Sequence, residues 1–213
     1  MKVQRFEFNM FGENTYVVWD EATSEAAVID PGMVNRGENK QFDTFIANNG
    51  LKLKYLLYTH LHVDHTFGHE HIVEMYRLEA TAHADEAPLG NQRQGQARMF
   101  GLPDDSLKAL PIDRQITDGE QIKLGEETIM ALLVPGHSPG SIAYYCPSAG
   151  MVFTGDALFH GSIGRTDLPG GNYQQLIHSI MTRLLTLPDD TVVYPGHGPS
   201  TTIGYEKKMN PYL

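Results

Sequence analysis

Thr59-His60-Leu61-His62-Val63-Asp64-His65 is the most informative segment of the chain, because it sets three histidines and one aspartate in the pattern H-x-H-x-D-H. An apolar, β-prone run at residues 53–58 precedes it, and a polar run of helical character at residues 69–78 follows. Imidazole and carboxylate groups suit zinc and its first-row neighbours. Such a pattern arises by chance in roughly 1 of 1,000 sequences of this length. We therefore predict a metal site rather than a turn of merely solvated histidines.

The composition is that of an ordinary globular protein. A chain of 213 residues with 41% hydrophobic and 20% charged residues can bury a substantial core. A net charge of −10 argues against a nucleic-acid-binding surface, although a few local cations or a metal could still attract a small anionic substrate. The one cysteine cannot form an internal disulfide. With no signal peptide and no run of about 18 apolar residues, we expect a cytoplasmic protein with no membrane partner.

Hydrophobic periodicity predicts strands and helices along the whole chain. Strands are expected at residues 3–8, 14–19, 25–29, 53–58, 79–82, 121–124, 127–134, 141–146, 151–154 and 191–194. Helices are expected at residues 38–49, 69–78, 84–99 and 173–187, with a loop after residue 99 and a short tail from residue 204. The polar segment 83–113 could be a substrate-facing flap or a plain surface helix. No repeat or long linker interrupts the chain, so we predict one domain spanning residues 1–213.

Three further residues of metal-binding type follow predicted strands, each directly after a glycine. These are His137, Asp156 and His197. Glycine allows the backbone to turn sharply, so that the next side chain can leave the end of the strand. One histidine after Pro-Gly would more often be an ordinary turn residue. Three such strand ends accompany a cluster that needs more ligands, so we predict that all three bind metal.

Taken together, these motifs resemble the metallo-β-lactamase superfamily. The H-x-H-x-D-H motif at residues 60–65 is followed in order by His137, Asp156 and His197, and Asp30 matches an early aspartate of the superfamily. The resemblance covers essentially the whole chain. It implies an α/β fold, the αββα four-layer sandwich, in which two sheets lie face to face with helices outside and the metal site at one edge.

The resemblance also implies a role for each motif residue. The expected ligands are His60, His62 and His137 for a first divalent ion and Asp64, His65 and His197 for a second. Asp156 would bridge the two ions together with a hydroxide, because two nearby cations need an anionic bridge. Asp64 could also orient that hydroxide, which makes Asp64 and Asp156 the predicted catalytic residues, and Asp30 would orient the cluster without binding. Zinc is the expected metal, with iron or manganese as alternatives.

Several segments resemble one branch, the hydroxyacylglutathione hydrolases or glyoxalase II. They lie at residues 135–141, 154–159 and 163–167, and the end of the chain resembles the short bacterial members, which lack a C-terminal helical domain. This resemblance implies a small-molecule substrate, the thioester of a 2-hydroxy acid. Tyr144 matches a tyrosine that contacts the thiol portion, or else is a core residue of its strand. Arg165 could meet a substrate carboxylate or hold its own loop.

Two other functions stay open. The segment Gly164-Arg165-Thr166-Asp167 also resembles the persulfide dioxygenases of the superfamily, which use one iron held by residues that match His60, His137 and Asp156. A purely structural metal is the third interpretation, although structural zinc sites are usually closed and rich in cysteine. The flavo-di-iron, β-lactamase and nuclease branches fit less well. The first has glutamate at position 62, the second has cysteine or serine at position 156, and the third carries an added domain or exosite that holds RNA.

Overall fold

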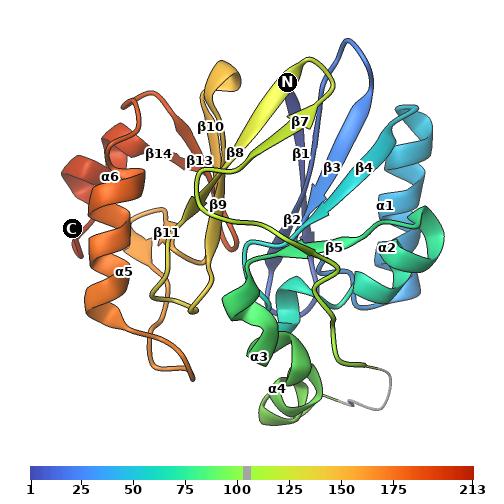
Figure 1. The fold of residues 1–213 in the computed structure, drawn as a ribbon, viewed down its shortest axis with the longest axis horizontal. Helices are drawn as coiled ribbons and strands as arrows, with labels where there is room; N and C mark the ends of the chain where they lie inside the picture. Colours follow the sequence, from blue (N-terminus) through green and yellow to red (C-terminus); the bar gives the residue numbers. More distant parts are fainter. Residues whose placement is uncertain (103–106) are drawn as a thin grey trace.

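Two six-stranded sheets form the centre of the structure, a computed structural model that describes residues 1–102 and 107–213 (Figure 1). The first sheet has the order β1-β2-β3-β4-β5-β6 and the second the order β14-β13-β10-β9-β8-β7. Strands β1 to β3 are antiparallel, whereas β3 to β6 run parallel. In the second sheet β10 and β13 are parallel and the other pairs are antiparallel. Both sheets are therefore mixed.

The strands are distributed between the two halves of the chain. The first sheet contains β1 (Lys2–Phe8), β2 (Glu13–Trp19), β3 (Glu25–Ile29), β4 (Lys52–Leu57), β5 (Ala80–Ala82) and β6 (Arg114–Gln115). The second contains β7 (Gln121–Leu124), β8 (Glu127–Leu133), β9 (Ile142–Cys146), β10 (Met151–Gly155), β13 (Val192–Pro195) and β14 (Thr201–Thr202). A separate hairpin is formed by β11 (Leu158–Phe159) and β12 (Ser162–Ile163).

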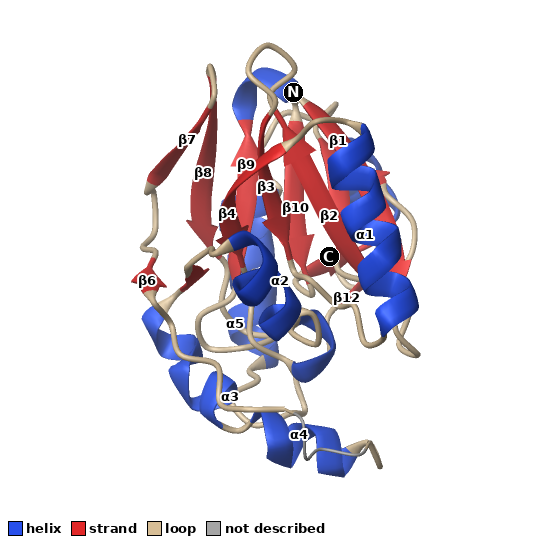
Figure 2. Cartoon of the chain, turned by 90° about the vertical axis from the view of Figure 1, so that its right-hand side faces the viewer, coloured by secondary structure: helices blue, strands red, loops and turns tan. Residues whose placement is uncertain are grey.

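Helices cover the outer face of each sheet, as Figures 1 and 2 show. The α-helices are α1 (Arg36–Asn48), α2 (His69–Tyr76), α3 (Ala87–Asn91), α4 (Arg93–Met99), α5 (Tyr173–Ser179) and α6 (Ile203–Met209). Helices α1 and α2 flank the first sheet and α5 and α6 the second, whereas α3 and α4 lie beyond the lower ends of the sheets in both views. None of the helices in the described part of the chain has the length and apolar content needed to cross a membrane.

Three clusters of buried apolar side chains explain the four layers. Alternate residues of β2 point to opposite faces of the sheet: Val17 packs towards α1 with Phe42, while Tyr16 and Val18 pack between the two sheets. A third cluster joins the second sheet to α5 and α6 through residues such as Leu176. Burial on both faces of each sheet produces the predicted αββα sandwich.

The predicted helices and tail differ from the structure in three places, one of which is the helix expected at 173–187: it is α-helical over Tyr173–Ser179 and continues as a π-helix over Ile180–Leu184. The helix expected at 84–99 is a short 3₁₀ turn followed by α3 and α4, and the chain leaves α-helical dihedral angles at Gln92 (φ −104°, ψ 15°) between them. The loop predicted after residue 99 includes residues 103–106, which lie outside the described residues. The expected tail from residue 204 is wrong, because α6 begins at Ile203 and the side chain of Thr202 caps it by accepting from the Tyr205 N–H.

Candidate metal centre

Side chains of metal-binding type from both sheets meet at one edge of the sandwich. They come from the loop after β4, which includes a 3₁₀ turn at Val63–His65, and from the turns after β8, β10 and β13. The residues brought together are His60, His62, Asp64, His65, His137, Asp156 and His197. The structure thus gathers all seven predicted ligands, which are separated by up to 137 positions in the sequence.

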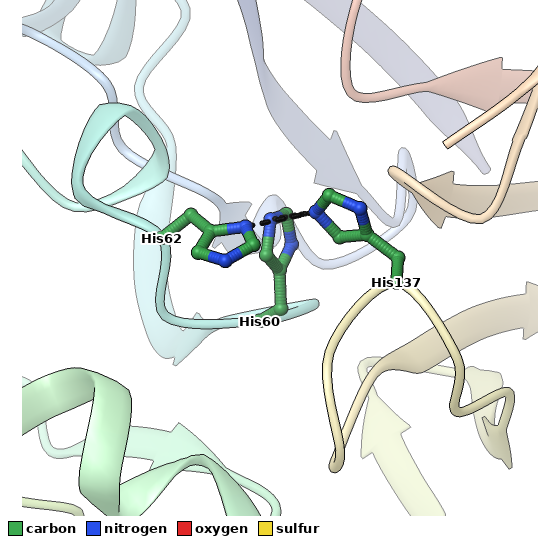
Figure 3. A group of neighbouring side chains, drawn as sticks. All are labelled: His60, His62 and His137. Carbon is green, nitrogen blue, oxygen red and sulfur yellow. Dashed lines mark hydrogen bonds between the residues drawn. The ribbon is translucent and has the colours of Figure 1, made fainter. Parts of the chain in front are cut away.

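The first group is His60, His62 and His137, whose ligand atoms all lie within 4.8 Å of one another. Figure 3 shows the three rings pointing towards one another from two different loops. His137 Nε2 lies 2.8 Å from His62 Nδ1 and 3.2 Å from His60 Nε2. On its other side, His137 Nδ1 donates to the carbonyl oxygen of Arg165 at 2.8 Å, so its Nε2 lone pair faces the group.

Burial keeps His60 and His62 of the first group in the state that a metal ligand needs. It lowers the pKa of His60 well below its usual value and, helped by the neighbouring His137, lowers the pKa of His62 to about 3. Both rings are therefore neutral at pH 7. Neutral imidazoles with converging lone pairs are the donors that zinc and its first-row neighbours take.

The second group is Asp64, His65 and His197, also within 4.8 Å. Asp64 Oδ2 lies 3.2 Å from His197 Nε2 and 3.7 Å from His65 Nε2. His197 Nδ1 donates to the carbonyl oxygen of Phe11, which turns its Nε2 towards Asp64. Burial opposes a charge on His65 and His197, but the nearby carboxylates outweigh it and raise the pKa of each ring. This group therefore concentrates negative charge that a cation can neutralise.

Asp156 lies between the two groups and reaches both. Its Oδ1 is 3.4 Å from His65 Nε2, and its Oδ2 is 3.6 Å from both His137 Nε2 and His197 Nε2. Although burial opposes its charge, the three histidines hold the pKa of Asp156 well below its usual value. Among the described residues, Asp156 Oδ1 and His65 Nε2 are buried atoms with no hydrogen-bond partner. Buried ligand atoms that face one another and lack hydrogen-bond partners fit a site for two metal ions that share Asp156.

Asp30 supports the cluster from behind. Its carboxylate accepts from the Thr59 N–H at 2.7 Å, from Thr59 Oγ1 at 2.5 Å and from His65 Nδ1 at 3.1 Å. Asp30 is close enough to His60 and His65 to be counted as a third possible ligand group. Because its oxygens already have these partners, its geometry is that of a residue that orients His65 rather than one that binds metal.

The glycines before the ligands are needed for different reasons. Gly136 has a φ of +133°, and a Cβ there would lie 2.2 Å from the backbone nitrogen of Leu176. Gly196 is needed for space: a Cβ would lie 2.2 Å from Asp156 Oδ1 and 2.7 Å from the His65 ring. The second glycine therefore keeps room for the ligands themselves, a role that the sequence alone did not indicate.

Two buried polar residues that the sequence did not single out hold the ligand loops. Glu86 is fully buried, and its carboxylate accepts from the Leu61 N–H at 2.8 Å and from the Gly140 N–H and Ser138 Oγ at 2.7 Å. It thereby links the loop of His60 and His62 to the turn of His137. Asn14 of β2 donates from Nδ2 to the Pro195 carbonyl oxygen at 2.9 Å, which anchors the turn of His197. Neither residue lies in a recognisable motif.

A cavity of about 570 Å³ opens onto the two groups. Residues of α4, the β11–β12 hairpin and the segment 165–169 line it, together with five of the predicted ligands. Helix α4 therefore faces the candidate metal centre, as the substrate-facing interpretation of segment 83–113 predicts. The cavity brings the candidate reaction centre into contact with solvent and leaves room for a small organic substrate.

The structure treats the two predicted substrate contacts differently. Arg165 lines the cavity, and its guanidinium makes two 2.7 Å hydrogen bonds to Asp167, so it also holds its loop. Tyr144 is fully buried between the sheets and donates its hydroxyl to the Tyr58 carbonyl oxygen at 2.9 Å. It does not reach the cavity, because its strand position points it into the core. Of the two predicted roles for Tyr144, the structure therefore supports the core residue and not the substrate contact.

Comparisons with known proteins agree with this arrangement. The family model for the metallo-beta-lactamase superfamily matches residues 9–197. The hydroxyacylglutathione hydrolase GloC of Haemophilus influenzae is 39% identical, over 100% of this chain and 98% of that protein. A crystal structure of BLEG-1 B3 metallo-beta-lactamase has a TM-score of 0.90 at 33% identity and covers 100% of this chain and 99% of its own. TTHA1623 in a di-iron-bound form has a TM-score of 0.86 at 37% identity, with coverages of 99% and 100%.

Proposed function

Because this chain belongs to the metallo-β-lactamase superfamily and carries a His/Asp metal site, we propose that it is a dinuclear hydrolase that cleaves the thioester of a small 2-hydroxy acid. The observation that carries the proposal is the position of Asp156. One of its oxygens faces His65 at 3.4 Å and the other faces His137 at 3.6 Å, so a single carboxylate lies next to both ligand groups. The similarity to GloC of Haemophilus influenzae, a hydroxyacylglutathione hydrolase, supports the choice of thioester.

The ligand assignment follows from the two groups. We propose that His60, His62 and His137 hold one ion, that Asp64, His65 and His197 hold the other, and that Asp156 bridges them. When bound, divalent ions at these positions supply Lewis acidity and lower the pKa of water towards about 7. Zinc is the metal we propose, and the di-iron form of TTHA1623 supports iron as the alternative.

The chain's own residues position the reacting groups. Asp64, at the cavity wall, would orient the attacking water by accepting a hydrogen bond from it. Asp30 and the carbonyl oxygen of Arg165 hold His65 and His137 in place. Water adds to the carbonyl carbon, the C–S bond breaks, and a carboxylate, a thiol and a proton are released. A thiol with a pKa of about 8.5 is a good leaving group, so the site needs no strong general acid.

The test is elemental analysis of the protein purified without added metal, combined with hydrolysis of S-lactoylglutathione. We expect close to two metal ions per chain and thioester cleavage that disappears after chelation and returns with added metal. Failure of the fully metallated protein to cleave either S-lactoylglutathione or a lactoyl thioester of another small thiol would overturn the proposal. Turnover of a β-lactam instead would place it with the B3 enzyme that it resembles in fold.

A persulfide dioxygenase is the second candidate, because His60, His137 and Asp156 also lie together. His137 Nε2 is 3.2 Å from His60 Nε2 and 3.6 Å from Asp156 Oδ2, which could hold one iron. One iron would leave four ligand-type residues unused: His62 of the first group and all three residues of the second group. One iron per chain, with oxygen consumed on a glutathione persulfide and no thioester cleavage, would favour the dioxygenase.

A further inference from the structure

The cavity beside the metal centre has apolar walls on two sides. On one side lie Met99 and Phe100 at the end of α4, with Phe11 next to them; on the other lie Phe159 and Ile163 of the β11–β12 hairpin. Met99 is 68% exposed and Phe100 44% exposed, and both line the cavity together with Phe11. Because such side chains are costly to leave in water, an exposed group of them at a cavity marks a binding surface.

This wall is braced and connected to the metal centre. The ring of Phe11 packs edge-on against Phe100 at 5.1 Å between centroids and stacks on Phe67 at 6.5 Å. The carbonyl oxygen of the same residue accepts the hydrogen bond that orients His197. Phe11 therefore contributes its ring to the apolar wall and its carbonyl oxygen to the orientation of the second ligand group.

The cavity offers little to a charged ligand. Within the described part of the chain, Arg165 is the one lining residue with a permanent positive charge, and Asp167 already makes two hydrogen bonds to it. The chain as a whole carries a net charge of −10. A glutathione thioester presents two carboxylates, each of which needs a cation or several N–H donors when it leaves water. Apart from metal ions held by the ligand groups, the described side chains that line the cavity supply one permanent cation.

We propose that the thiol portion of the substrate is apolar, so that the enzyme acts on thioesters of aryl or alkyl thiols in preference to thioesters of glutathione. The inference rests on the proposed function. A small 2-hydroxyacyl group fills only the part of the 570 Å³ cavity next to the ligands, so the thiol portion occupies the remaining space between the two apolar walls. The reacting thioester carbonyl is the same in both classes of substrate. The apolar walls select the group attached to the thioester sulfur.

A matched pair of substrates tests this inference: the lactoyl thioester of benzyl thiol and S-lactoylglutathione. Each enzymatic rate is divided by the rate at which hydroxide hydrolyses the same compound, which corrects for differences in intrinsic reactivity. We expect kcat/KM for the benzyl thioester to be higher by roughly tenfold or more. An equal or greater kcat/KM for the glutathione thioester would overturn the inference while leaving the thioesterase standing. Cleavage of neither by the metal-loaded protein would overturn the proposed function, and the inference with it.

A matched pair of variants locates the preference in the wall. Met99→Ser removes an apolar contact at the cavity, whereas Met75→Ser changes a methionine of similar exposure, 59%, on α2 and outside the cavity. We expect Met99→Ser to raise KM for the benzyl thioester roughly fivefold to tenfold, and to raise KM for the glutathione thioester clearly less. Met75→Ser should match the wild type. An equal effect of Met99→Ser on both substrates, or none on either, would show that this wall does not select the thiol.

Discussion

At the scale of single residues, Asp156 should matter more than any other side chain of the centre, because it touches both ligand groups. Asp156→Ala should lose both metal ions and reduce kcat/KM by more than about a hundredfold, since even partners outside the ligand set commonly cost 10–100-fold. Elemental analysis and thioester hydrolysis measure the two effects. Asp167→Ala, an exposed carboxylate beside the cavity, should keep both ions. Two retained ions and normal turnover in Asp156→Ala would show that the bridge is wrongly assigned.

Glu86 allows a second prediction, because one carboxylate serves two ligand loops. Glu86→Gln keeps the shape but replaces an acceptor oxygen with an NH₂ group, so that the Leu61 N–H or the donors of Ser138 and Gly140 lose their partner. We expect a loss of about 1–3 kcal/mol in the free energy of unfolding. Because the displaced loops carry His60, His62 and His137, affinity for the first ion should also fall by roughly 10–100-fold.

The control for Glu86 is Glu206→Gln. Glu206 is likewise fully buried and accepts from the Gly161 N–H and Thr201 Oγ1, but within the described part of the chain it makes no hydrogen bond to a ligand loop. Titration of each chelated variant with zinc separates the two roles: both should be less stable, and only Glu86→Gln should bind metal more weakly. Equal zinc affinity in the two variants would show that Glu86 supports the fold alone.

At this scale the sequence predicted the residues whose chemistry repeats in a local pattern, and missed those defined by long-range contacts. The ligand types and the glycines before them are visible in the chain itself. Glu86 and Asn14 are ordinary polar residues until the fold brings them to partners 25 to 181 positions away. Tyr144 shows the opposite failure, because a match to a superfamily motif suggested a substrate contact, whereas both faces of β9 pack against buried apolar clusters and no residue of β9 lines the cavity.

At the scale of elements, a turn far from the metal centre joins the two sheets. Asp20, at the end of β2, accepts from the Ala22 N–H and Thr23 Oγ1 in its own turn and from the Glu126 N–H between β7 and β8. These hydrogen bonds, the one from the Glu126 backbone first, lower the pKa of Asp20. A carboxyl whose pKa is lower in the folded state stabilises the fold above its unfolded pKa of about 3.9, and this stability is lost as pH falls through the folded pKa.

Asp20→Asn should therefore reduce stability in a pH-dependent way. The free energy of unfolding should differ most between wild type and Asp20→Asn at pH 7. The difference should disappear at pH values below the folded pKa, because the wild-type carboxyl is then neutral as well. Urea unfolding of metal-free samples across this range measures it without interference from the ligands. A difference that stays constant with pH would show that the turn does not depend on the charge.

Helices and strands could be predicted where the apolar periodicity was long. Predictions were unreliable where tertiary contacts define the element. Helix α1 and the long strands follow clear apolar periodicity, whereas β6, β11 and β12 are two residues each and leave too short a pattern to detect. The break before α4 has a packing cause. Arg93 is fully buried and binds Glu70 at 2.7 Å and the Thr66 carbonyl oxygen at 2.7 Å, which fixes the start of α4 against the metal-binding loop.

At the scale of the whole molecule, the ordered set of motifs indicated the αββα sandwich, while the shape of the cavity could not be read from the chain. The motifs specify which strand ends meet, and the superfamily resemblance supplies the layers. The cavity walls come from α4, the β11–β12 hairpin and Phe11, whose meeting depends on the packing of segments about 150 positions apart. A single domain over residues 1–213 stays a prediction.

The same architecture predicts that metal stabilises the fold. His60, His62, Asp64 and His65 follow a strand of the first sheet, whereas His137, Asp156 and His197 follow strands of the second. Ions held by both sets would link the sheets only in the folded chain. Free metal at about 100 times its dissociation constant adds about 2.7 kcal/mol per site. For a domain of this size each kcal/mol raises Tm by roughly 2–4 °C.

Chelation should therefore lower Tm by roughly 5–10 °C for each ion lost, and added zinc should restore it. Scanning calorimetry of the wild type with chelator, and then with excess zinc, measures the shift. Asp156→Ala, which should hold neither ion, serves as the control, and its Tm should not respond to either addition. If the wild type kept the same Tm with and without metal while its metal content changed, the ions would bind without linking the sheets. The loops at the sandwich edge would then be held by Glu86, Asn14 and Asp30 alone.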